Sequence, residues 1–195
     1  MANSEIQVLR AKILEIKQQN QSYCNTLKEL ISSEKTEKSS QFICYFTYSL
    51  NLAHGLKSEN LCIGSFHLLN SGTAPITNPC ICIQLSKEAP FEFSGKYVNK
   101  GMTVSKNLSV DWERINEPSN KEEIWLKPLK QQTVEPNQKL TFPSFQLKWL
   151  PKESYSGQVN GFGYCDEFNE GMAALNTISL SGTVPEQGEK NEEES

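Results

Sequence analysis

The sequence contains few of the residues from which most enzyme active sites are built. Only two histidines (His54 and His67) and two aspartates (Asp111 and Asp166) occur among its 195 residues. Triads of the serine, histidine and aspartate type therefore have few available members. The sequence also lacks a nucleophile elbow, a phosphate-binding loop and a dinucleotide-binding glycine motif. We predict a protein that is not an enzyme and that uses no cofactor and no metal ion.

Long apolar segments and an excess of basic charge are also absent. No apolar run approaches the roughly 18–20 residues of a membrane-spanning helix, and the N-terminal residues do not resemble a signal peptide. The net charge of −4 comes from residues 185–195, which hold one basic and five acidic side chains. We expect a protein of the cytoplasm, or of a particle assembled there, with no membrane span and no affinity for nucleic acid.

The first 34 residues contain a heptad repeat. Apolar residues follow one another at spacings of three and four, which is typical of a coiled coil. The a and d positions are Ile6, Leu9, Ile13, Ile16, Asn20, Tyr23, Leu27 and Leu30. Asn20 is the polar residue among these positions. It favours one register, because its side-chain amide can hydrogen-bond to Asn20 of a second, parallel copy of the helix. The repeat predicts a homo-oligomer, either a dimer or a trimer.

An alternative interpretation is an amphipathic helix that folds back on its own domain. Val8, Leu14 and Ile31 widen the apolar stripe beyond a strict seam, as such packing requires. In both interpretations the helix needs a partner surface, because an isolated helix of this length is only marginally stable in water.

From residue 41 onward the apolar period changes to two, which is typical of β-strands. Turn-forming residues, among them Asn169–Gly171, separate the candidate strands. Within 138–149 the apolar phase slips at Pro143, which indicates a bulge or an edge position. The candidate strands are 41–52, 61–69, 80–85, 90–93, 107–113, 122–127, 138–149, 157–164 and 174–184.

These patterns predict a mainly β chain: an antiparallel immunoglobulin-like β-sandwich preceded by an N-terminal coiled-coil helix. The expected helix covers residues 1–34 and a polar linker covers 35–40. The sandwich domain covers 41–184, and an acidic tail at 185–195 is expected to be disordered because it has no apolar residue.

Two segments carry a family resemblance. Residues 66–79, Phe-His-Leu-Leu-Asn-Ser-Gly-Thr-Ala-Pro-Ile-Thr-Asn-Pro, and residues 134–142, Val-Glu-Pro-Asn-Gln-Lys-Leu-Thr-Phe, resemble turn-and-strand segments of bacterial immunoglobulin-like β-sandwich modules. The resemblance implies a seven-stranded sandwich used for spacing, adhesion or assembly. It implies no catalytic residues.

The six cysteines are expected to be reduced, because no export signal places them in an oxidising compartment. Cys80 and Cys82 share one face of a strand, opposite its isoleucines, and both face outward if the isoleucines are core. A zinc site that adds Cys62 and His67 lacks the usual ligand spacing. Cross-linking between chains through Cys24, Cys80 or Cys82 is a further alternative, as is a role as small strand hydrophobes.

The preferred functional hypothesis is a non-catalytic structural or adaptor protein. The coiled coil would oligomerise the sandwich, which would bind at least one protein partner, as in a spore-coat or phage-type assembly. The alternative is a carbohydrate- or small-ligand-binding module that uses surface aromatics. The candidate ligand aromatics are Trp112, Trp125, Phe162 and Tyr164.

Overall fold

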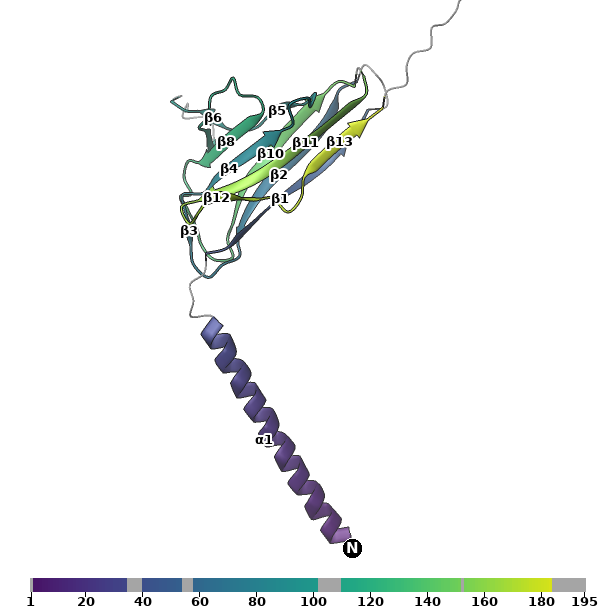
Figure 1. Ribbon diagram of the computed structural model, residues 1–195, viewed down its shortest axis with the longest axis vertical. Coiled ribbons are helices and arrows are strands. Elements are labelled where there is room, and N and C mark those ends of the chain that lie inside the picture. The colour runs from purple at the N-terminus through teal and green to yellow at the C-terminus, as the bar shows by residue number, and fades with distance from the viewer. Residues whose placement is uncertain (1, 35–39, 54–57, 102–109, 152, 184–195) are drawn as a thin grey trace, which may run out of the picture. The chain divides into compact units, whose positions relative to one another are not determined.

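The computed structural model describes residues 2–34, 40–53, 58–101, 110–151 and 153–183. The chain divides into two compact units, residues 1–39 and residues 40–195. The first contains helix α1 (Ala2–Glu34), and the second contains strands (Figure 1). Most of the expected linker, the expected acidic tail and His54 lie outside the described residues. Within the described residues, no helix combines the length and hydropathy that crossing a bilayer requires.

The strands of the second unit alternate buried and exposed side chains over most of their lengths, as the period of two predicts. The longer strands are β1 (Phe42–Asn51), β2 (Asn60–Asn70), β4 (Cys80–Leu85), β8 (Glu123–Pro128), β10 (Lys139–Trp149), β11 (Tyr155–Cys165), β12 (Phe168–Ala173) and β13 (Ile178–Gly182). The shorter ones are β3 (Ile76–Thr77), β5 (Glu92–Ser94), β6 (Val98–Asn99), β7 (Trp112–Arg114) and β9 (Thr133–Val134).

These strands form two main sheets. One has the order β1-β2-β10-β5, and the other has the order β12-β11-β4-β8-β7-β6, with β13 also paired to β11 (Figure 1). A third, two-stranded sheet joins β3 to β9. All described pairs are antiparallel except β6 with β7. The prediction of a mainly β chain with one N-terminal helix and antiparallel sheets is confirmed.

The core lies between the inner faces of the two main sheets. Phe46 and Phe66 from the first sheet lie over Gly161 of β11 in the second. A Cβ atom at Gly161 would overlap the Phe66 ring and lie 2.7 Å from the Phe46 ring, so only glycine permits this close approach. The isoleucines of β4, Ile81 and Ile83, are buried in the same core, as expected.

The phase slip at Pro143 is a β-bulge. The register between β10 and β2 shifts between Phe142 and Phe145, and Ser144 has a φ of 53°. Pro143 and Ser144 lie opposite the single residue Ser65 of β2, and this one extra residue lets both phenylalanines face the core, where their rings stack with a centroid distance of 6.3 Å. The prediction of a bulge is therefore confirmed.

Two sequence predictions of local structure are wrong. Asn169–Gly171 was expected to be a turn, but these residues lie within β12, and the chain turns at Asp166 and Glu167. The expected strand at 174–184 is shorter, since β13 begins only at Ile178. Leu175 and Asn176 instead hydrogen-bond to the outer side of β1.

Candidate functional site

The first candidate surface is the apolar stripe of α1. Its side chains are described for residues 7–31, so the side chain of Ile6 lies outside the described part. Six apolar seam residues are between 52% and 67% exposed: Leu9, Ile13, Ile16, Tyr23, Leu27 and Leu30. Asn20 is exposed among them, and Val8, Leu14 and Ile31 widen the stripe. This apolar surface is suited to contact with another helix.

The second candidate surface is the free edge of β1. The Asn176 side chain accepts a hydrogen bond from the Phe46 N–H (2.8 Å) and donates one to the Phe46 carbonyl oxygen (3.0 Å). These groups of Phe46 therefore point away from β2. Alternate residues of a strand direct their backbone groups to the same side, so those of Tyr48 and Leu50 point to the same edge. No described residue forms a hydrogen bond with these backbone groups of Tyr48 and Leu50.

The side chains at this edge are apolar and uncharged. Tyr48 is 43% exposed and Leu50 is 42% exposed. No residue from 41 to 53 is charged. Natural sheet edges are usually protected from association by charge, by proline or by a covering segment. The part of β1 after Phe46 has no charge, no proline and no covering segment among the described residues. It is therefore able to pair with another strand.

The third candidate surface is an aromatic cluster on the outer face of the second sheet. Phe162, Cys82 and Trp125 are opposite one another in register across β11, β4 and β8. Tyr164 lies against Trp125, with 4.9 Å between ring centroids. The Trp125 indole N–H donates to a Glu123 carboxylate oxygen (3.2 Å), which fixes the ring. The structure thus brings together three of the four candidate ligand aromatics.

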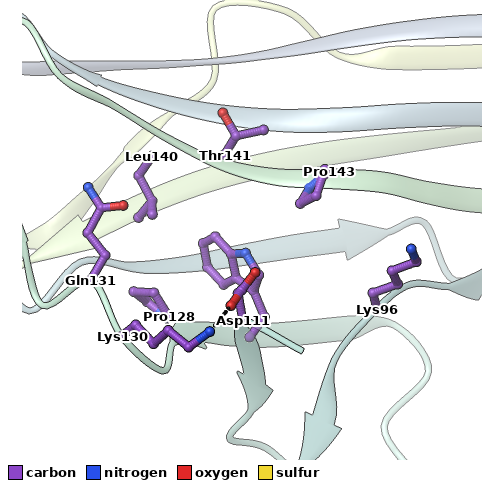
Figure 2. Close-up of a pocket in the computed structure, with 9 residues that line it drawn as sticks. Lys96, Asp111, Pro128, Lys130, Gln131, Leu140, Thr141 and Pro143 are labelled. Carbon is purple, nitrogen blue, oxygen red and sulfur yellow. Dashed lines mark hydrogen bonds and ion pairs between the residues drawn. The ribbon is translucent and has the colours of Figure 1, made fainter. Parts of the chain in front are cut away.

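The fourth, Trp112, lies elsewhere. It is 3% exposed and packs edge-on against the Phe142 ring, with 5.4 Å between centroids. It also lines a shallow pocket of about 260 Å³, where Asp111 and Lys130 form an ion pair of 2.8 Å (Figure 2). Because its ring is almost completely buried, Trp112 acts mainly as a core residue at this position.

Cys80 and Cys82 lie on the outer face of the second sheet, opposite the buried isoleucines, as expected, but neither thiol is well exposed. Cys80 is half-buried, and Cys82 is only 3% exposed because aromatic residues of the neighbouring strands flank it. Burial raises the pKa of Cys80 to about 11 and that of Cys82 to about 12. Both thiols are therefore protonated and unreactive at neutral pH. Of the three cysteines considered for cross-linking, Cys24 is the exposed one.

His67 joins three strands of the first sheet. Its imidazole hydrogen-bonds to the hydroxyls of Thr47 (2.9 Å) and Thr141 (3.0 Å). Burial, and secondly the charge of Lys139, lowers the His67 pKa, so the ring is neutral at neutral pH. Cys62 lies on the opposite, core-facing side of the same strand. These two residues therefore cannot bind the same zinc ion.

Asp166 and Glu167 tie the turn after β11 to β3. Glu167 accepts hydrogen bonds from the Thr77 backbone N–H at 3.0 and 3.1 Å. Asp166 accepts one from the Asn78 amide at 2.7 Å. Desolvation raises the Glu167 pKa, but hydrogen bonds from Thr77, from the Glu167 backbone and from Cys165 together lower the pKa overall. The contacts of this carboxylate pair are structural.

Comparisons with known proteins place the chain in no family. No protein-family model matches it, and no curated protein matches it. Among solved structures, a GH20 exo-β-N-acetylglucosaminidase from Vibrio harveyi, bound to N-acetylglucosamine, has a TM-score of 0.31 and 7% identity. That alignment covers 73% of this chain and 17% of the enzyme. A GH18 chitinase from Chromobacterium violaceum has a TM-score of 0.31 and 10% identity, over 68% of this chain and 18% of the chitinase. This chain therefore spans less than a fifth of either enzyme.

Proposed function

We propose that the protein is a non-catalytic structural protein that self-associates through α1. Its β-rich unit, an immunoglobulin-like sandwich, is presented for protein–protein assembly in a cytoplasmic particle or scaffold. The observation that carries the proposal is the exposed heptad stripe of α1. Asn20 favours a second copy of the same helix as the partner, because its amide is satisfied by the same residue of that copy.

The free edge of β1 supplies a second self-contact in this proposal. If two copies pair antiparallel about Ser49, Tyr48 of one lies opposite Leu50 of the other. No like charges meet across such a pair, because the strand has no charged residue. The two copies would join their four-stranded sheets into one. With one contact on the helix and another on β1, copies can link beyond a single pair, and each weak contact gains from the other.

The substitution Asn20→Leu tests the helix contact. Leucine removes the polar member of the seam, so the helices become more stable but lose the residue that specifies their number and register. We expect the mass by light scattering to change from one oligomer to a mixture or a larger species, and the helix to melt at a higher temperature. The control is Gln18→Leu, which adds the same side chain outside the seam. An unchanged mass and melting temperature for Asn20→Leu would contradict the seam assignment.

A second candidate function is carbohydrate or small-ligand binding at the aromatic cluster. The observation that favours it is the meeting of Trp125, Phe162 and Tyr164 on one sheet face. A glycan that stacks on these rings would shift the tryptophan emission in a saturable way. We expect the shift to be lost in Trp125→Leu. If no glycan of a broad panel shifts the tryptophan emission, this result would count against the function.

A further inference from the structure

A larger cavity than the Trp112 pocket opens between the two sheets at their β5 and β8 side. Its volume is about 540 Å³, within the range of about 300–1,000 Å³ for small-molecule sites. Its apolar wall is formed by Ala89, Pro90, Phe91, Phe93, Pro118 and Ile124. Phe91 and Ile124 belong to the buried core, so the cavity gives access to core side chains. The charged residues that line it are Glu92, Arg114 and Lys121.

Arg114 is a buried cation in this wall. It is only 6% exposed, and its Nε donates to the Asn116 side-chain oxygen at 3.1 Å. Its Nη2 donates to the backbone carbonyls of Glu117 (3.2 Å), Asn120 and Glu123 (3.3 Å). All of these acceptors are neutral. No carboxylate of a described residue forms an ion pair with it. A buried cation held only by neutral groups retains affinity for an anion.

The remaining nitrogen of the guanidinium is Nη1. No described residue accepts a hydrogen bond from it. Among the described residues, the fully buried side-chain nitrogen or oxygen atom that lacks a hydrogen-bond partner is Trp149 Nε1. Because Arg114 Nη1 also lacks a partner but does not belong to this class, it is not fully buried. Nη1 therefore keeps access to solvent, and the cavity is the space that Arg114 lines.

We propose that this cavity binds a small monocarboxylic acid with an aryl or alkyl body. The body would lie against Phe91, Phe93 and Ile124, where apolar surface is already formed. The carboxylate would accept hydrogen bonds from Arg114 Nη1 and from the Lys121 ammonium. Glu92 carries the opposing charge, so the lining has a net charge of +1 and matches a monoanion better than a phosphate or a dicarboxylate. This site is independent of the proposed self-association.

The test is calorimetric titration of the full chain with 4-phenylbutyrate, octanoate and phenylacetate, each compared with the neutral alcohol of the same skeleton. We expect saturable binding of at least one acid, with an affinity about tenfold or more above that of its alcohol, since a charge-assisted hydrogen bond contributes roughly 1.5–3 kcal/mol. Lys121→Gln should weaken acid binding several-fold and leave alcohol binding unchanged.

The control is Lys130→Gln, which removes the same charge beside the Trp112 pocket and should change neither affinity. Arg114→Gln should abolish the preference for the acid over the alcohol. Because it also removes the hydrogen bonds that hold residues 116–123, the Lys121→Gln variant is the decisive test. Tryptophan emission of each variant checks that the core, where Trp149 packs on Phe91 at 5.3 Å, is intact. No binding at millimolar concentration, equal affinity for acid and alcohol, or an unaffected Lys121→Gln would each overturn the proposal.

Discussion

The double substitution Ile13→Glu and Leu27→Glu is expected to reduce the mass of the protein to that of a single chain. Both residues occupy a positions and are more than half exposed on α1, at 52% and 57%. In a paired coil, glutamates at these positions would face glutamates of the partner in an apolar seam, and burying unpaired charges costs several kcal/mol or more. Light scattering measures the mass directly.

The helical signal in circular dichroism should fall in the same variant. An isolated helix of this length is marginal in water, so most of its stability must come from the partner. A variant that loses the partner should therefore lose most of its helix as well. A single-chain mass with full helical signal would instead favour the alternative interpretation, in which the helix docks on its own strand-rich unit.

The matched control is Gln18→Glu with Asn25→Glu. These residues occupy the f positions of the heptad, on the side of α1 opposite to the seam, and add the same charge to the same helix. We expect their mass to equal that of the unmodified protein. If both pairs of substitutions dissociate the oligomer equally, overall charge and not the seam controls its mass. A single-chain mass for the unmodified protein would contradict self-association through α1.

The substitution Leu50→Lys is expected to abolish association beyond the coiled-coil oligomer. In an antiparallel pair about Ser49, each added ammonium would lie beside the Tyr48 ring of the other copy, and two like charges would enter the same short interface. Lysine on an edge strand is also the device by which natural sheets avoid edge-to-edge pairing. Sedimentation velocity over a range of protein concentrations should show larger species for the unmodified chain and none for Leu50→Lys.

Ile63→Lys is the matched control for the β1 edge. Ile63 is 40% exposed, close to the 42% of Leu50, and lies on β2, but its side chain points to the other face of the sheet. We expect this variant to assemble like the unmodified chain. Slow hydrogen exchange at the amides of Tyr48 and Leu50 in the assembled state would locate the contact on β1. Rapid exchange there at all concentrations would contradict pairing through this edge.

Local periodicity in the sequence was enough to predict much of the fold. The heptad repeat predicted α1, and the alternation of apolar residues located most of the longer strands to within a few residues, although it missed β12 and placed the start of β13 too early. The slip at Pro143 predicted the bulge in β10. These features are local: in a helix or strand, the spacing of apolar residues along the chain determines which side chains share a face. Short strands such as β3 and β9 were not predicted, because a strand of two residues is too short to show a periodicity.

The tertiary structure decided which residues form surfaces and which are buried. It placed β1 at a sheet edge, joined Trp125 with Phe162 and Tyr164, and buried Trp112. Arg114 and Lys121 gave no motif in the sequence, yet the structure brings them to one cavity with β5. The reason is physical: strand order and sheet packing depend on contacts between segments far apart in the chain. Local periodicity determines the face on which a side chain lies, and only those distant contacts determine what covers that face.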